Sequence, residues 1–285
     1  MSEEQTPTVS VIMPTYGNRG FLAESVQSVL AQTFADFELL VVDDHSREPI
    51  ETGTDDPRVR VIRMPSNQGP AAARNTGIVL ARGRFVAFLD DDDLYPPDRL
   101  QRGVDEIGEA TVHCVPITTS DRRFDGDLRS SLAALGIPLL QQVMLRREDC
   151  LQFDPSLRTS EDGEWWLRMR DRAVFHWSEG APVWYRLDDE PRPGVDLEVR
   201  LRDRESVAAR HLHWMDRSAR AHRFAMLAYS SLVAGRRIKA LRYAVLQFSN
   251  VPSFAAMKMA IRALTVGTDD EDAGRRRRSA ARRME

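Results

Sequence analysis

The sequence predicts an α/β fold with a mainly parallel, Rossmann-like mixed sheet flanked by helices, and a helical extension at its C-terminal end. Through about the first hundred residues, short apolar segments alternate with segments of helical spacing, which is typical of a parallel sheet covered on both faces. Several apolar segments run directly into acidic or polar residues. Beyond about residue 195, apolar residues recur at helical spacing.

Local patterns justify each element of the first half. The segment at 10–16 is apolar up to Pro14, which ends a strand, and the segment at 21–32 places apolar side chains on one helical face. The segment at 58–64 alternates at period two, and a helix-like segment ends at Gly83. In chain order we expect a strand at 10–16, a helix at 21–32, strands at 37–44 and 58–64, a helix at 71–83 and a strand at 84–93 that ends in acidic residues.

The second half is organised differently. Residues 104–160 are less regular, and a helix opened by acidic residues is expected at 161–171, where the helix dipole favours them. A proline-rich linker follows at 190–194. We therefore predict three parts: an α/β domain at residues 7–190, a helical region at 191–268 and a charged, disordered tail at 269–285.

Composition excludes several classes of protein. With 285 residues, 42% hydrophobic and 29% charged, the chain is neither fibrous nor disordered as a whole. Cys114 and Cys150 are too few for a disulfide framework and lack the spacing of a zinc site, so we expect both to be reduced. Neither a signal peptide nor a run of about 18 apolar residues is found, and we expect a cytoplasmic protein.

Charge is segregated along the chain. Residues 1–190 carry 20 Lys and Arg against 33 Asp and Glu, a net charge of −13, whereas residues 191–268 carry 14 against 5, a net charge of +9. A basic helical region can face a polyanion, either an anionic membrane or nucleic acid. A solvated arginine-rich surface explains the same numbers, and both interpretations stay open at this point.

The strongest local signal is the run of acidic residues Asp90–Asp93 after an apolar segment. Such carboxylates repel one another unless a cation or hydrogen-bond donors offset their charge. Oxygen ligands without His or Cys suit Mg²⁺ or Mn²⁺, which commonly bridge carboxylates to substrate phosphates. A solvated acidic loop and a phosphatase-type nucleophilic aspartate are alternatives. Because no Walker loop and no dinucleotide-binding glycine motif are found, an ATPase or a dehydrogenase is disfavoured.

Five segments in order resemble the signatures of the inverting, nucleotide-sugar-dependent glycosyltransferases of the GT-A fold known as glycosyltransferase family two. The resemblance covers about residues 8–187. The segments are VSVIMPTY, ELLVVDDHS, NQGPAAARNTGI, ARGRFVAFLDDDDLYPPDRL and FDPSLRTSEDGEWWLRM. The resemblance implies a GT-A fold and a metal-dependent sugar transfer with inversion. It also implies a nucleoside diphosphate sugar as the donor, with UDP favoured over dTDP.

The first two segments imply a base pocket. Pro14, Thr15 and Tyr16 match its lining, with Tyr16 against the base, where a ring would stack a pyrimidine. Asp43 matches the acceptor of the base imide, for which a carboxylate is suited because it only accepts hydrogen bonds. Its neighbour Asp44 is expected to support the loop.

The next two segments imply contacts to the nucleotide and the metal. Arg74 matches a residue that approaches the nucleotide, and an ion pair on the helix surface is the alternative. Asp90 and Asp92 match the Asp-x-Asp motif, with Asp90 toward the ribose and Asp92 as the ligand of Mn²⁺ or Mg²⁺. Asp91 is counted with the donor-binding residues, because the adjacent Asp91 and Asp93 leave the register ambiguous.

The fifth segment implies the general base. Asp162 matches the carboxylate that deprotonates the acceptor hydroxyl, with Glu161 beside it, although plain helix capping explains the same pair. Trp165 and Trp166 are expected either to stack on a sugar or to lie in the core. The family often places a histidine after the Tyr185–Arg186 pair, and this chain lacks it there. We expect His176 to be a strand residue and not a ligand.

Together these observations predict a hexosyltransferase that acts on a lipid-linked or surface-glycan acceptor. Its basic helices would dock at the inner face of an anionic membrane. A non-catalytic protein that binds nucleotide sugars with the same fold is the alternative. We expect no nucleic-acid partner, because the arginine-rich tail lacks stacking aromatic residues.

Overall fold

The computed structural model describes residues 6–17, 20–119, 138–186 and 196–265. The chain forms two compact units, Met1–Val195 and Asp196–Glu285, which are described separately. The linker predicted at 190–194 and the tail predicted at 269–285 lie outside the described residues.

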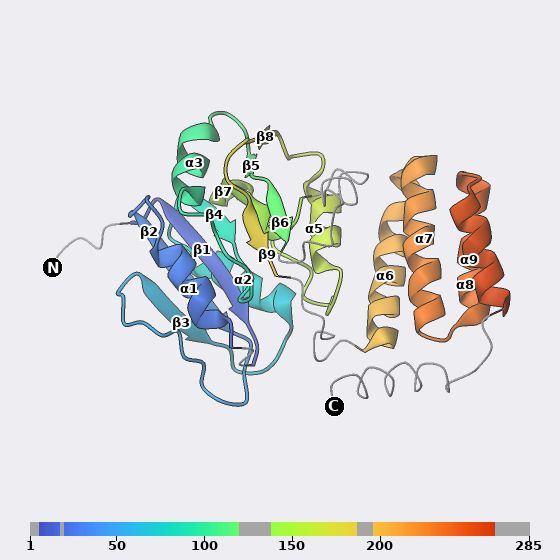
Figure 1. The fold of residues 1–285 in the computed structure, drawn as a ribbon, viewed down its shortest axis with the longest axis horizontal. Coiled ribbons are helices and arrows are strands. Elements are labelled where there is room, and N and C mark those ends of the chain that lie inside the picture. The colour runs from blue at the N-terminus through green and yellow to red at the C-terminus, as the bar shows by residue number, and fades with distance from the viewer. Residues whose placement is uncertain (1–5, 18–19, 120–137, 187–195, 266–285) are drawn as a thin grey trace, which may run out of the picture. The chain divides into compact units, whose positions relative to one another are not determined.

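The first unit is built on a seven-stranded sheet of order β3-β2-β1-β4-β7-β5-β8 (Figure 1). Parallel pairing joins β3, β2, β1 and β4, whereas β7 is antiparallel to both of its neighbours. The prediction of a mainly parallel α/β sheet is confirmed. The strands of the large sheet are β1 (Val9–Thr15), β2 (Phe37–Asp43), β3 (Val59–Arg63), β4 (Phe85–Phe88), β5 (Val112–Cys114), β7 (Val143–Arg146) and β8 (Phe175–Trp177).

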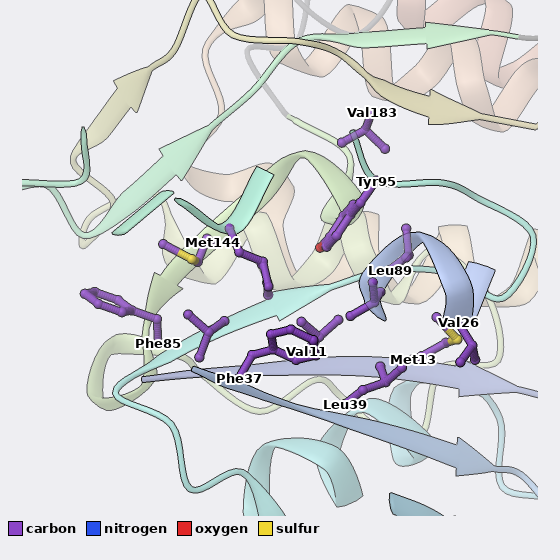
Figure 2. Close-up of a cluster of buried hydrophobic side chains, with 14 of the residues drawn as sticks. Val11, Met13, Val26, Phe37, Leu39, Phe85, Leu89, Tyr95, Met144 and Val183 are labelled. Atoms are coloured by element: carbon purple, nitrogen blue, oxygen red, sulfur yellow. The ribbon is translucent and has the colours of Figure 1, made fainter. Parts of the chain in front are cut away.

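Helices cover both faces of this sheet. Side chains of β1 alternate between the faces: Val11 and Met13 pack with helices α1 and α3, whereas Ile12 packs with α2 and α5. Figure 2 shows Val11 and Met13 in the first of these clusters. The helices are α1 (Leu22–Leu30), α2 (Pro70–Leu80), α3 (Arg99–Glu106) and α5 (Glu161–Met169).

Helix α2 lies unusually close to the sheet. A Cβ atom placed on Gly77 would come within 2.4 Å of Cγ2 of Ile12, so only glycine permits this approach. The helix ends three residues before the predicted end at Gly83. Strand β4 ends at Phe88 rather than at Asp93, so the acidic run forms a loop at the carboxyl end of the strand. A small parallel sheet of β6 (Ile117–Thr119) and β9 (Val183–Tyr185) lies beside this loop, because Leu94 pairs with Trp184.

The second unit consists of helices whose core combines leucine and alanine residues. Its main cluster contains Leu201, Ala208 and Leu227, and the buried residues of α8 are Ala240 and Ala244. Among the described helices, none is both long and apolar enough to cross a bilayer. The helices are α6 (Leu197–His211), α7 (Arg217–Val233), α8 (Arg237–Asn250) and α9 (Phe254–Thr265).

Candidate active site

The carboxyl end of β2 presents Asp43. Its carboxylate is almost fully buried and accepts hydrogen bonds from the backbone N–H of Ser46 at 2.8 Å, from the Ser46 hydroxyl and from Nη1 of Arg63 at 2.8 Å. The turn behind it needs His45 at a φ of 63°, a left-handed conformation that is uncommon outside glycine. The sequence predicted a hydrogen-bond acceptor at this point, but did not predict its partner Arg63.

Asp44 fastens the loop that leads into α2. Its two carboxylate oxygens accept the backbone N–H groups of Gln68 and Gly69, each at 2.7 Å. Gly69 has a φ of 94°, which favours glycine and turns the chain into the helix. The structure thus identifies the loop that Asp44 contacts as residues 68–69.

Strand β1 joins the ends of its two neighbours. The hydroxyl of Thr15 donates to Oδ2 of Asp91, and the carbonyl of Thr15 accepts from the backbone N–H of Asp44 at 2.9 Å. The ends of β1 and β2 and the loop after β4 are therefore in direct contact. Tyr16 follows with a side chain that is 52% exposed, and Pro14 is partly buried.

The acidic loop gathers three of its four carboxylates. Asp90, Asp92 and Asp93 each offer an oxygen atom, and these atoms lie within 4.8 Å of one another, whereas Asp91 is bonded to Thr15. Burial, together with the charges of Asp90 and Asp92, raises the pKa of Asp93 to about 8. Three crowded carboxylate oxygens without nitrogen or sulfur ligands fit a hard divalent cation. The predicted ligand Asp92 belongs to this group; Asp93 was not among the predicted ligands.

Two polar side chains that the sequence did not single out for this role hold the acidic loop. Gln141 donates to Oδ2 of Asp93 at 2.5 Å. The backbone N–H of Arg186 donates to Oδ1 of Asp93 at 2.8 Å, and Nε of Arg186 donates to the carbonyl of Asp92 at 2.9 Å. The Tyr185–Arg186 pair was visible in the sequence, whereas nothing there marked Gln141. The residues directly after Arg186, where the family often has a histidine, lie outside the described residues.

Arg74 of α2 joins the acidic loop to helix α5. Its guanidinium is 5% exposed and donates to Oδ1 of Asp90 and to Oε1 of Glu161, each at 2.8 Å. Burial favours a lower pKa for Arg74, but the charges of Asp90 and Glu161 raise it above its ordinary value. This is a buried bridge rather than the surface ion pair considered above. The contact between Arg74 and a nucleotide stays a prediction.

The N-terminal end of α5 presents Glu161 and Asp162. Glu161 is buried, and this burial raises its pKa although the charge of Arg74 opposes the effect. Asp162 is only partly buried, and its Oδ1 accepts from the backbone N–H of Gly163 at 2.6 Å. Ser160 before them has a φ of 63°. Strained backbone of this kind is often found at functional sites.

Trp165 and Trp166 are core residues. They are 0% and 4% exposed, and the Trp165 ring stacks on Phe153 with centroids 5.2 Å apart. Of the two interpretations left open for this pair, packing is correct. The rings hold α5 against Phe88 of β4, the strand that leads into the acidic loop.

A second cluster, of Glu106, His113 and His176, lies on α3, β5 and β8. His176 is a strand residue, as predicted, and its ring stacks on His113. Arg99 faces Nδ1 of His113 at 3.4 Å, so Nε2 carries the proton and donates to Glu106 at 3.2 Å. Because a metal would need the lone pair of Nε2, this donor arrangement fits a hydrogen-bonded pair better than a metal site.

The mainly parallel sheet and its flanking helices have the GT-A fold. The chain belongs to glycosyl transferase family 2, whose family model matches residues 10–173. The resemblance noted in the sequence is therefore confirmed.

Some of the relatives in sequence are named for glycan biosynthesis. The chain is 38% identical over 110 residues to the succinoglycan biosynthesis protein ExoO of Rhizobium meliloti. These residues are 38% of this chain and 32% of that protein. It is 28% identical over 189 residues to the putative colanic acid biosynthesis glycosyl transferase WcaA of Escherichia coli K12, covering 58% and 67%. The chain thus spans about a third of the length of ExoO.

Solved structures share the fold. TarS 1–349 of S. aureus, in complex with UDP, aligns with a TM-score of 0.63 at 19% identity, covering 90% of this chain and 88% of that one. The mannosyltransferase PcManGT from Pyrobaculum calidifontis, in complex with GDP-Man and Mn²⁺, aligns with a TM-score of 0.56 at 19% identity, covering 98% and 81%. At these identities the likeness establishes the fold alone.

Proposed function

We propose that the chain is a metal-dependent, inverting hexosyltransferase that moves one sugar from a UDP-sugar to a hydroxyl of a lipid-linked or surface-glycan acceptor. The observation that carries this proposal is the unbroken series of contacts from Asp43 through Thr15 and the acidic loop to Arg74 and Glu161. It joins Asp43, the proposed base-binding carboxylate, to the proposed cation site and to Glu161, the neighbour of the proposed general base Asp162.

The donor is proposed from the residues at the ends of β1 and β2. The half-exposed ring of Tyr16 is suited to stack a pyrimidine. Asp43, whose carboxylate accepts from Ser46 and Arg63 in this structure, is the proposed acceptor of the imide N–H of the base. TarS was crystallised with UDP and with UDP-GlcNAc. A relative of Escherichia coli is named a UDP-Glc glucosyltransferase. It is 41% identical over 96 residues, which cover 33% of this chain and 38% of that protein. We therefore favour UDP over dTDP.

The cation is proposed from the donor set of the acidic loop. Asp90, Asp92 and Asp93 would hold Mn²⁺ or Mg²⁺. The chemistry supplied by the bound ion is neutralisation of the charge that develops on the departing diphosphate. Mn²⁺ is present with GDP-Man in the PcManGT structure.

The chemical step is proposed as a single displacement. Asp162 takes the proton of the acceptor hydroxyl, the hydroxyl oxygen bonds to the anomeric carbon, and the bond from that carbon to the diphosphate oxygen breaks, with its electron pair leaving on the diphosphate. One attack from the opposite side inverts the configuration. Arg74 and Glu161 fix the N-terminal end of α5, and so the position of Asp162 relative to the acidic loop.

The acceptor class is proposed from relatives that act in glycan biosynthesis. The Escherichia coli relative WfgD is named for an acceptor joined to diphosphoundecaprenol, a membrane lipid. With the basic helical region, this favours a cytoplasmic enzyme that works at the inner face of the cell membrane.

The test compares Asp162→Asn with Asp171→Asn. Asp171 lies two residues after the end of α5, and its side chain is 76% exposed. With Mn²⁺ and a panel of nucleotide sugars, we expect Asp162→Asn to lower the rate of transfer by about 10²- to 10⁴-fold, the usual contribution of a general base. Asp171→Asn should retain the rate, and both variants should keep the thermal shift caused by UDP.

Each other outcome has a definite meaning. Unchanged transfer by Asp162→Asn would exclude Asp162 as the base. UDP binding by the wild type without transfer to any acceptor would favour the non-catalytic, nucleotide-sugar-binding alternative. Absence of any thermal shift with UDP, with and without Mn²⁺, would contradict both.

A further inference from the structure

Helix α9 exposes a stripe of large apolar side chains. Phe254, Met257, Ile261 and Leu264 are 68%, 45%, 50% and 63% exposed. Their spacing of three, four and three residues places them along one face of the helix. Ala256 and Ala263 are buried on the other side, toward the helical unit. The large side chains of α9 therefore point to solvent while small ones form the packing face, the reverse of an ordinary globular helix.

The charged side chains on helices α8 and α9 are all positive. Helices α8 and α9 contain five basic residues and no acidic residue. Two of the five are engaged within the unit, since Lys239 pairs with Glu205 and Arg237 donates to the last carbonyls of α9. Lys258 and Arg262 make no ion pair within the part of the chain that the structure describes, and Nζ of Lys258 lies over the ring of Phe254, 5.4 Å from its centroid. They follow Phe254 by four and eight residues and so lie along one edge of the stripe.

We propose that this face of α9 is an anchor that lies on the surface of an anionic membrane. The four apolar side chains would enter the boundary between headgroups and acyl chains, and Lys258 and Arg262 would contact lipid phosphates. Twelve residues of helix are about 18 Å long, less than the roughly 30 Å of a hydrocarbon core, so α9 lies in the interface and does not span it. The inference rests on the proposed function in one respect: the lipid-linked acceptor of that function is found at such a surface.

Other occupants fit the face less well. In a two-fold dimer through α9, Lys258 and Arg262 of both copies would approach one another, and neither α8 nor α9 has a carboxylate to pair with them. A nucleic acid would need basic and aromatic side chains at the centre of the face, where this stripe has mainly aliphatic ones. An anionic bilayer matches both the apolar centre and the basic edge.

The test is flotation of the full-length protein with vesicles, in the absence of any nucleotide sugar. We expect the wild type to float with vesicles of phosphatidylglycerol in phosphatidylcholine, and to float much less with pure phosphatidylcholine or at high salt. Replacing both Lys258 and Arg262 by Gln should weaken binding about 25-fold, because each charge near the surface contributes about fivefold. The double substitution Ile261→Ser with Leu264→Ser should weaken binding at least tenfold.

The matched control is Val79→Ser, which removes an equally exposed valine, 67% accessible, from α2 of the first unit and should leave flotation unchanged. All substituted side chains are exposed, so thermal unfolding should be retained in each variant. Absence of flotation by the wild type, or flotation that Ile261→Ser with Leu264→Ser does not weaken, would overturn the proposal. So would a dimer in sedimentation velocity that this double variant dissociates.

The two proposals can fail separately. Sugar transfer to a soluble acceptor by a protein that does not float would overturn the anchor and retain the enzyme. Flotation by a protein that neither binds UDP nor transfers sugar would retain the anchor and overturn the enzyme.

Discussion

The two units of the chain use charged and apolar side chains in opposite ways. In the first unit, charged groups such as Asp43, Arg74 and Glu161 are buried and paired. In the second, large apolar groups such as Ile238 and Phe254 of α8 and α9 are exposed, while alanines form the buried side of these two helices. Buried charges must keep their partners, whereas an exposed face can change without unfolding the protein. Single substitutions should therefore affect stability and catalysis in the first unit, and surface binding in the second.

The largest effect in this comparison is expected from Arg74→Gln. The substitution leaves the carboxylates of Asp90 and Glu161 without their shared cation, and breaking a buried pair costs about 3–5 kcal/mol. Because α5 also loses its tie to the acidic loop, transfer should fall by about a hundredfold, the usual cost of a displacement of about 1 Å. Urea unfolding and the rate of sugar transfer measure the two effects.

The control is Arg60→Gln, which removes the ion pair between a partly exposed arginine and Glu38. That carboxylate keeps Arg82 as a second partner, so the expected loss is below about 1 kcal/mol. Adding Glu161→Gln to Arg74→Gln should restore part of the stability, because one of the two stranded charges is removed. Equal losses for Arg74→Gln and Arg60→Gln would show that burial of the bridge does not matter.

A smaller effect is expected from Asp44→Asn. Asparagine keeps one oxygen acceptor, but its amide nitrogen would face the second backbone N–H of the pair at Gln68 and Gly69. An unsatisfied buried donor costs about 1–3 kcal/mol, and the loosened loop should raise the KM for the donor. The same change at Asp154, an acid that accepts from Ser156 on the surface, should cost less. Similar losses at both positions would contradict a special role for the loop before α2.

Most of the fold of the first unit could be predicted because its central strands are buried on both faces. Such strands appear in the sequence as nearly continuous apolar runs, as in β1 and β2. Asp43 and Asp44 mark the end of β2, whereas Pro14 lies next to the last residue of β1. Strand β7 could not be predicted in the same way. It is four residues long and lies within the irregular segment at 104–160, where no period is long enough to recognise.

The candidate site was predictable as a set of residues but not as a set of contacts. Arg74 bonds to Asp90 and Glu161, which are 16 and 87 residues away, and one sequence does not reveal pairing over such separations. The arrangement of the acidic run depends on a local turn in which the backbone N–H of Asp93 donates to the carbonyl of Asp90. This turn gathers Asp90, Asp92 and Asp93 and leaves Asp91 to Thr15.

An effect of pH on stability is expected from His113. Burial, with the nearby Arg99, lowers its pKa to about 4, whereas in the unfolded chain it is near 6.5. Between these values the unfolded chain binds more protons, so the free energy of unfolding should fall as pH falls from about 6.5 to about 4. His113→Gln should flatten this part of a plot of Tm against pH. An unchanged slope would mean that other groups, such as His222 of α7, whose pKa burial also lowers, account for it.

The smallest effect is expected from Ile238→Ser in α8, where the isoleucine side chain is 88% exposed. Isoleucine and serine have similar helix propensities, and the loss of an exposed side chain changes stability by at most about 0.5 kcal/mol. Urea unfolding followed by helical circular dichroism measures it, and transfer to a soluble acceptor should be unchanged. A loss above about 1 kcal/mol would mean that another part of the chain covers this face in solution. In that case the exposed apolar surface of the second unit would be an internal packing surface, and the contrast between the two units would no longer hold.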